Sequence, residues 1–98
     1  MKKELINELF EKFEQACYVF KGIECWSARE LQGIFNYSDW RNFIKVIDKA
    51  KDACSNSGEA LSDHFVDVNK MIEIGKGGQR DVDDIALTRY ACYLVAQN

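Results

Sequence analysis

The stretch "EIGKGGQRDV" (residues 73–82) combines three glycines with a lysine and an arginine, a composition that can bind phosphate. A P-loop needs G-x-x-x-x-G-K-[ST] at the start of a helix, and no hydroxyl residue follows Lys76 in that register. The dinucleotide motif G-x-G-x-x-G also fails, because Arg80 stands where its third glycine belongs. The residues on both sides favour β-strands, so no helix amino terminus is expected to point at a phosphate here. The sequence therefore disfavours a nucleotide-binding loop.

The same stretch fits the tip of a β-hairpin that carries cations. Lys70 lies on the approach to this tip, Lys76 and Arg80 lie at it, and Glu73 is the one acid between residues 70 and 80. Glycines keep the backbone low, so long basic side chains can reach a phosphate backbone. A solvated, flexible loop explains the same composition equally well. The residues alone leave both interpretations open.

Three cations recur at every fourth position along one side of a predicted helix: Arg41, Lys45 and Lys49. Like charges at this spacing destabilise a helix by about 0.2–0.5 kcal/mol per pair, so their clustering suggests a role such as contact with DNA. Asn42 adds a side chain that can read a base edge if the helix enters a groove. The competing interpretation is an exposed face that Asp48 and Asp52 neutralise through salt bridges.

Acidic residues flank the glycine-rich loop, and carboxylates can bind the metal ions of nucleases. They are Asp63, Asp67, Asp81, Asp83 and Asp84, with His64 beside the first of them. Their spacing specifies no Mg²⁺ site. The four cysteines (Cys17, Cys25, Cys54 and Cys92) contain no C-x-x-C pair, so zinc is not indicated either. Their apolar neighbours predict buried, reduced thiols, and the sequence predicts no catalytic residue, cofactor or metal site.

Hydrophobic periodicity predicts the elements that carry these residues. An amphipathic pattern predicts a helix over 3–17, and β-favouring residues over 18–26 predict a short hairpin. Ser27 and Glu30 form a capping box for a helix that runs to about Phe35.

The longest predicted helix follows Ser38, which we expect to cap it, and leaves the helical conformation at Gly58. Its apolar face comprises Trp40, Phe43, Ile44, Ile47, Ala50 and Cys54. A short helix over "ALSDHF" precedes a second hairpin with strands at 66–74 and 80–88. Thr88 is expected to cap a last helix, "RYACYLVAQN". This order predicts one α+β domain over residues 1–98, winged helix-turn-helix-like, with four to five helices and two short β-hairpins.

Length and charge limit the class of protein. With 98 residues, of which 47% are hydrophobic, there is room for one domain with a core. The formal net charge of −3 argues against a generally basic coat for nucleic acid, so any anion-binding surface must be local. The first residues, "MKKELINELF", lack the apolar region of a signal peptide, and no apolar run is long enough to span a membrane. We expect a cytoplasmic protein without a membrane partner.

Three segments carry a resemblance to a known family: "ECWSARELQGIFNYSDWRNF" (24–43), "AKDACSNSG" (50–58) and residues 63–98. They resemble the N-terminal region of bacterial DNA-damage-inducible proteins, which belongs with the BRO-N domains of phage antirepressors and large DNA viruses. The combination of "WSAR" with "RYACYL" is specific, and the likeness runs from Phe10 to Asn98. The first dozen residues match less well.

The resemblance implies a DNA-binding N-terminal domain of a protein induced in the DNA-damage (SOS) response. Family members continue past the position that matches Asn98, so we expect these residues to be the first part of a longer protein. The family offers no catalytic motif to carry over. Its recurrent positions correspond here to Trp26, Arg29, Tyr37, Phe43, Arg80, Arg89 and Tyr90.

We therefore predict a non-enzymatic DNA-binding module. The residues expected to contact DNA are Arg41, Asn42, Lys45, Lys49, Lys70, Lys76 and Arg80. Arg29 and Arg89 are weaker candidates, because either could instead pair with internal acids. The alternative is a protein-interaction domain that modulates a DNA repair or recombination factor through an acidic patch at Asp81, Asp83 and Asp84. A homodimer is compatible with either function.

Overall fold

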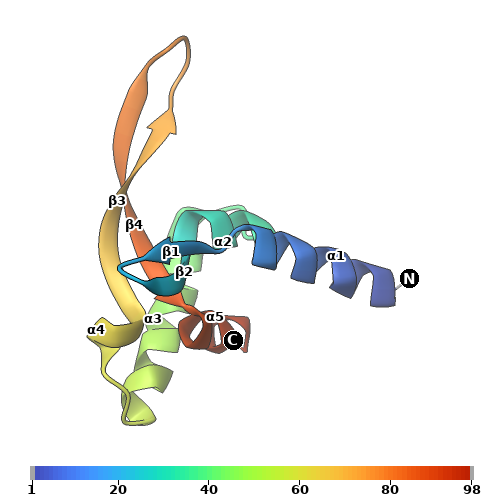
Figure 1. The fold of residues 1–98 in the computed structure, drawn as a ribbon, viewed down its shortest axis with the longest axis vertical. Coiled ribbons are helices and arrows are strands. Elements are labelled where there is room, and N and C mark those ends of the chain that lie inside the picture. The colour runs from blue at the N-terminus through green and yellow to red at the C-terminus, as the bar shows by residue number, and fades with distance from the viewer. Residues whose placement is uncertain (1, 98) are drawn as a thin grey trace.

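The computed structural model describes residues 2–97, with side chains over 7–97 (Figure 1). Its elements are, in order, α1 (Lys2–Gln15), β1 (Tyr18–Phe20), β2 (Ile23–Ser27), α2 (Ala28–Ile34), α3 (Trp40–Asn56), α4 (Leu61–His64), β3 (Phe65–Glu73), β4 (Gln79–Thr88) and α5 (Arg89–Ala96). The predicted α+β class is confirmed. Within the predicted apolar stripe of the first helix, the side chains of Leu5 and Ile6 lie outside the described residues, as does Asn98.

The four strands form one antiparallel sheet in the order β1-β2-β4-β3. The two predicted hairpins are therefore joined, because β2 pairs with β4 through Cys25↔Thr88, Trp26↔Leu87 and Ser27↔Ala86. The strands of the second hairpin agree with the predicted ranges to within one residue at each end, and β3 and β4 pair without a break from Phe65↔Leu87 to Glu73↔Gln79. Beyond Ser27↔Ala86, β4 has only β3 as a partner.

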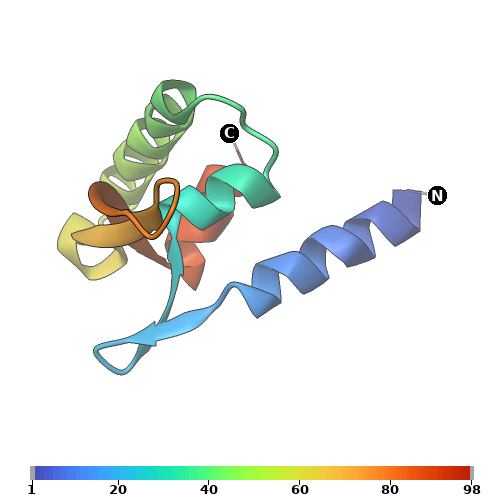
Figure 2. The same ribbon diagram turned by 90° about the horizontal axis from the view of Figure 1, so that it is seen from above.

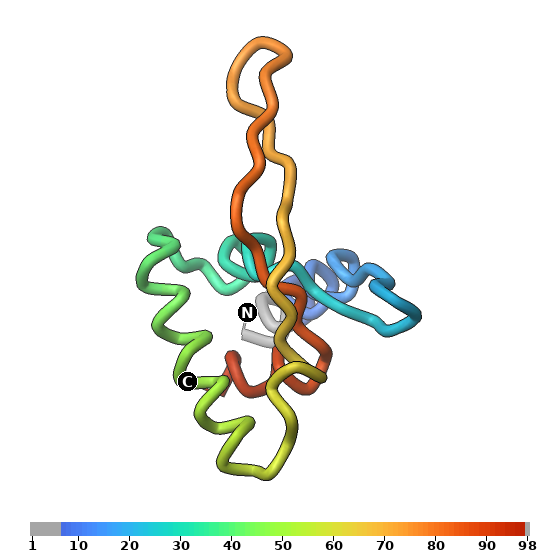
Figure 3. The backbone as a smooth tube through the Cα atoms, turned by 90° about the vertical axis from the view of Figure 1, so that its left-hand side faces the viewer, coloured from blue at the N-terminus to red at the C-terminus, as the bar shows by residue number. Residues whose placement is uncertain are grey.

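The unaccompanied part of this hairpin projects from the body of the molecule, as Figures 1 and 3 show. We call residues 67–85 the ribbon, because Asp67↔Ile85 is the first β3–β4 pair beyond the last β2–β4 pair. Its tip lies at one end of the longest axis, which measures 45 Å, and the C-terminal end of α3 lies at the other. In Figure 2, α1 leads away from the other helices as an arm. The described helices include none that is both long and apolar enough to cross a bilayer.

Side-chain caps explain where three of the helices begin. The hydroxyl of Ser27 accepts a hydrogen bond from the backbone N–H of Glu30 at the start of α2, as the capping box predicted. Thr88 caps α5 in the same way by accepting from Ala91. The prediction that Ser38 caps the longest helix was wrong. Asp39 is its N-cap and accepts from the N–H of Arg41 at 2.9 Å, because the helix begins one residue later, at Trp40.

The core lies where α2, α3 and α5 meet the base of the sheet. Its largest fully buried side chains include Trp26, Leu31, Phe43, Ile47 and Leu87. Phe13 of α1 stacks on the Trp26 ring with centroids 4.4 Å apart, and the Trp26 indole N–H donates to the Phe13 carbonyl at 2.6 Å. Trp26 is therefore a fully buried core residue, and it fixes the end of α1 to the body.

The four cysteines are all free thiols, of which Cys25, Cys54 and Cys92 are buried and Cys17 is half-buried. Burial raises the pKa of all four thiols above the ordinary cysteine value, because the charged thiolate is poorly solvated inside the fold. These thiols are therefore protonated at neutral pH, and they act as small apolar packing groups.

Candidate nucleic-acid interface

The register of the ribbon places its strand cations and its exposed carboxylates on opposite faces, while the buried Asp84 lies on the same side as Lys70 and Arg80. Residues that lie directly opposite each other on antiparallel strands share a face, and successive residues alternate between faces. The pairs Lys70↔Val82 and Ile72↔Arg80 therefore place Lys70 and Arg80 on one face. The pairs Asp67↔Ile85, Asn69↔Asp83, Met71↔Asp81 and Glu73↔Gln79 fall on the other. We call these the basic face and the acidic face of the ribbon.

The tip of the ribbon is a five-residue loop that exposes Lys76. The N–H of Ile74 donates to the carbonyl of Gly78 at 3.0 Å and closes the loop. Gly75 and Gly77 have φ angles of 78° and 74°, in the left-handed region where glycine is favoured. Lys76 is therefore exposed on the loop that forms the tip of the ribbon.

Lys70 is the one predicted contact residue on the ribbon that already has a partner. Its Nζ lies 3.3 Å from Glu30 Oε1 and 3.5 Å from Ser27 Oγ, both at the start of α2. The Lys70 and Glu30 side chains are 32% and 50% exposed, so this pair stabilises the fold only weakly. A phosphate would have to compete with Glu30 for Lys70.

The predicted contact residues of α3 all face solvent. Phe43, Ile47, Ala50 and Cys54 are buried on one side of this helix, as predicted. Arg41, Asn42, Lys45 and Lys49 are exposed on the other. Within residues 7–97, none of the three cations forms an ion pair, so the predicted neutralisation by Asp48 and Asp52 is not seen.

The structure does not gather the two groups of cations into one cluster. Trp40 and Ile44 of α3 border a hollow together with Asp67, Asn69 and Asp83, which belong to the acidic face of the ribbon. Helix α3 therefore lies on that side of the sheet, whereas Lys70 and Arg80 point to the other side. The two groups form separate basic sites on an otherwise acidic molecule.

Arg89 is used inside the fold, as one of the two sequence alternatives anticipated. Its guanidinium donates to both carboxylate oxygens of Glu14, at 2.9 and 3.1 Å, and to Glu24 at 3.4 Å. These hydrogen bonds hold the pKa of Glu14 below its usual range and raise the pKa of Arg89. Arg89 therefore ties α1 and β2 to the start of α5.

Asp84 does not belong to a surface acidic patch, contrary to the sequence-based alternative. It is 3% exposed, and its carboxylate accepts hydrogen bonds from the Ser27 hydroxyl and the Arg29 backbone N–H. Strand alternation alone does not reveal this, because the β4 residues in the hydrophobic core are Ile85 and Leu87, and Asp84 lies on the opposite face with Val82 and Ala86. Asp81 and Asp83 remain exposed on the acidic face.

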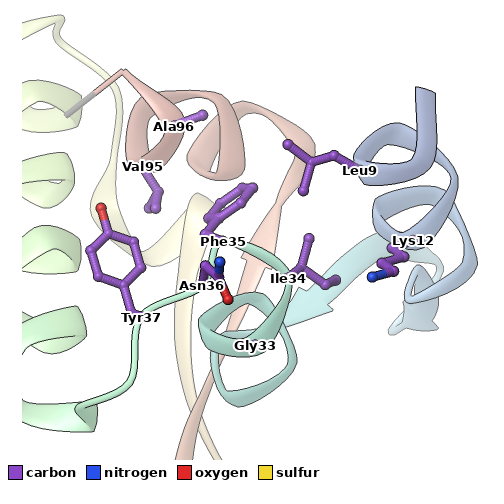
Figure 4. A pocket seen from close by; sticks show the side chains of 9 residues that line it. All are labelled: Leu9, Lys12, Gly33, Ile34, Phe35, Asn36, Tyr37, Val95 and Ala96. Atoms are coloured by element: carbon purple, nitrogen blue, oxygen red, sulfur yellow. The ribbon is translucent and has the colours of Figure 1, made fainter. Parts of the chain in front are cut away.

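The remaining acids and hollows offer little chemistry. Among the described residues, no three His, Cys, Asp or Glu side chains converge in a way that could hold a metal ion. His64 Nδ1 lies 2.7 Å from the Thr88 hydroxyl, and its ring packs against Tyr90. A hollow of about 530 Å³ lies between α1, the turn after α2 and α5, and its ionisable lining residues are Lys12 and Tyr37. Figure 4 shows the side chains that line it.

Comparison with known proteins places these features in a family. Residues 15–98 match the family model described as the BRO family, N-terminal domain. Over 94 residues, or 95% of the chain, the sequence is 46% identical to DNA damage-inducible protein D of Escherichia coli (strain K12). The match covers 34% of the length of that relative. No solved structure matches the chain.

Proposed function

The chain belongs to the BRO family, N-terminal domain, and from that premise we propose that it is a DNA-binding module of a bacterial protein of the DNA-damage (SOS) response, with no catalysis of its own. The name of the Escherichia coli relative supports the link to DNA damage. Action on DNA would place the protein in the bacterial cytoplasm.

The observation that carries the proposal is the ribbon with its cations on one face. The major groove of B-DNA, about 12 Å wide, admits a two-stranded β-ribbon. Arg80 on the basic face and Lys76 at the tip would meet phosphates or base edges, and Lys70 would join them on release from Glu30. Within the ribbon, phosphate would repel the carboxylates of the acidic face, so the basic face would contact DNA, and α3 on the other side of the sheet would have to meet a different stretch of the duplex.

Helix α3 supplies a second basic surface. Arg41, Lys45 and Lys49 are exposed and unpaired among the side chains described, and Asn42 can donate to and accept from a base edge. The order α2, turn, α3, α4, hairpin is similar to that of a winged helix-turn-helix apart from the short α4, with the ribbon in the place of the wing. We propose this arrangement as the mode of binding.

Salt-dependent titration tests the proposal. Binding of the chain to a duplex of about two helical turns should weaken steeply with salt, because each phosphate contact releases counterions. Removing both tip cations, in Lys76→Ala/Arg80→Ala, should lower the slope of log K against log salt by about two. Lys12→Ala, which removes an exposed lysine from α1, is the matched control and should leave the slope unchanged. A flat salt response of the native chain would contradict the proposal.

The acidic face of the ribbon supports the second candidate, a protein-interaction domain that acts on a DNA repair or recombination factor. Asp67, Glu73, Asp81 and Asp83 are exposed there beside Met71, whose side chain is 57% exposed. A basic partner would bind this face rather than the basic one. This function would be favoured if the native chain bound such a partner but not DNA. The double variant Asp81→Asn/Asp83→Asn should then lose binding to the partner. A homodimer is compatible with either function. Sedimentation of the free chain measures its oligomeric state.

A further inference from the structure

The ribbon leaves the body at a buried carboxylate. Asp84 Oδ2 accepts from the Ser27 hydroxyl at 2.5 Å, and Oδ1 accepts from the Arg29 N–H at 3.1 Å. Both oxygens are therefore held by the residues that begin α2. A buried carboxylate is costly unless it is hydrogen-bonded in this way, so the strand and the helix are fixed to each other at this point.

Arg29 extends the connection from α2 to the other candidate DNA-binding element. Its Nε donates to the backbone carbonyl of Asp83 in the ribbon at 2.7 Å. The centre of the same guanidinium lies 4.1 Å from the centroid of the Trp40 ring, at the first residue of α3. A planar guanidinium can donate along its edge while its face lies against an aromatic ring, and a lysine cannot do both. Arg29 thus contacts the ribbon and α3 at once.

We call Ser27, Arg29 and Asp84 the α2 clamp. We propose that the α2 clamp sets the angle between the ribbon and α3, and that Asp84 and Arg29 are positioning residues for DNA binding. This inference rests on the proposed function. A two-stranded ribbon without a third strand can bend at its base, and two basic surfaces on one chain reinforce each other only if both can reach DNA in one orientation.

The orientation of the ribbon can be measured without DNA. Residual dipolar couplings of the ribbon amides in the native chain should fit the same alignment tensor as those of the core helices. In Arg29→Lys and in Asp84→Asn, the ribbon couplings should depart from that tensor while the core couplings stay. Asp81→Asn is the matched control, since it removes the same charge from the exposed ribbon and no described contact with α2. The inference would be overturned if the ribbon couplings of the native chain already failed to fit the tensor of the core helices. It would also be overturned if the ribbon couplings of the variants still fitted that tensor. Neither outcome depends on what the chain binds.

A double-mutant cycle tests the effect on DNA. Asp84→Asn should weaken duplex binding by about tenfold when the tip cations are present, because the two basic surfaces no longer act together. In the Lys76→Ala/Arg80→Ala background the same substitution should change affinity little, since the ribbon then has no tip contact to position. Equal losses in both backgrounds would show general damage and would overturn the inference. Arg29→Lys keeps the charge and should behave like Asp84→Asn. A native chain that binds no DNA would sink the proposed function alone, and the dipolar couplings would still decide the clamp.

Discussion

At the scale of single residues, the cations of this chain divide between structural and available ones. Arg89 is engaged by Glu14 and Glu24, and its guanidinium also lies 4.8 Å from the Trp26 ring. Lys76, Arg80 and Lys45 are exposed and, among the described side chains, form no ion pair. The second group can therefore contact a polyanion without losing an ion pair. For Arg89, the same contact would require breaking the hydrogen bonds to Glu14 that hold α1 in place.

The Glu14–Arg89 pair predicts a pH dependence of stability. The pKa of Glu14 is lowered in the folded chain, so the pair contributes stability above the ordinary glutamate pKa and loses it as the pH falls through the folded value. We expect the free energy of unfolding to fall below about pH 4.3, and Glu14→Gln should remove part of that fall. Denaturant unfolding at neutral and acid pH measures it. Glu8→Gln, on the exposed side of α1, is the control, and an equal effect in both variants would contradict the assignment.

Glu30 predicts a gain of DNA binding by substitution. Because its carboxylate holds Lys70 at 3.3 Å, Glu30→Gln should free that lysine for phosphate. We expect duplex affinity to rise about threefold, which corresponds to the strength of an exposed ion pair. Glu73→Gln removes the same charge from the acidic face and is the matched control. A similar rise in both variants would mean that only net charge matters, and a fall in Glu30→Gln would show that Lys70 makes no contact.

At the scale of elements, the first and last residues of α3 and its buried face show how far a local sequence pattern determines structure. The spacing of Phe43, Ile47, Ala50 and Cys54 predicted its buried face, and Gly58 predicted its end. Its start was wrong by one residue, because Ser38 and Asp39 are both good caps and the choice depends on where Trp40 packs. Strand alternation places Asp84 on the face opposite the core residues Ile85 and Leu87, and its partners Ser27 and Arg29 are more than fifty residues away, so no local signal predicts its burial.

Two glycines give opposite predictions for helix stability. Gly58 ends α3 with φ 84°, and the N–H of Glu59 then reaches back to the Cys54 carbonyl at 3.2 Å. An alanine there should destabilise the chain by about 1 kcal/mol, because a Cβ disfavours the left-handed conformation. Gly33 lies inside α2 with open space around it, so Gly33→Ala should stabilise by about 0.5–1 kcal/mol. Denaturant midpoints compare the two, and a neutral Gly58→Ala would contradict the left-handed end of α3.

At the scale of the whole molecule, the joining of the hairpins decides the shape. Each hairpin is local and was predicted from nearby residues, the first from the β-favouring residues over 18–26 and the second from its strand patterns and the glycines near Lys76. The pairing of β2 with β4 joins residues about sixty positions apart, and alternation within each strand does not specify which edge meets which. That pairing stops at Ser27↔Ala86, which is why the ribbon projects and why its two faces can differ in charge.

The distance between the two basic surfaces predicts how affinity should depend on duplex length. The ribbon tip and the C-terminal end of α3 lie at opposite ends of a 45 Å axis, and the α3 cations at positions 41–49 precede that end, so both basic surfaces fall within about 13 base pairs at 3.4 Å per step. A shorter duplex can satisfy one surface only, so affinity should rise with length up to roughly that size and then change little. Arg41→Ala/Lys45→Ala/Lys49→Ala should flatten the rise without weakening the shortest duplexes. Native affinity that is independent of length, with an intact effect of the tip cations, would show that the ribbon alone contacts DNA and that the cations of α3 are solvated surface.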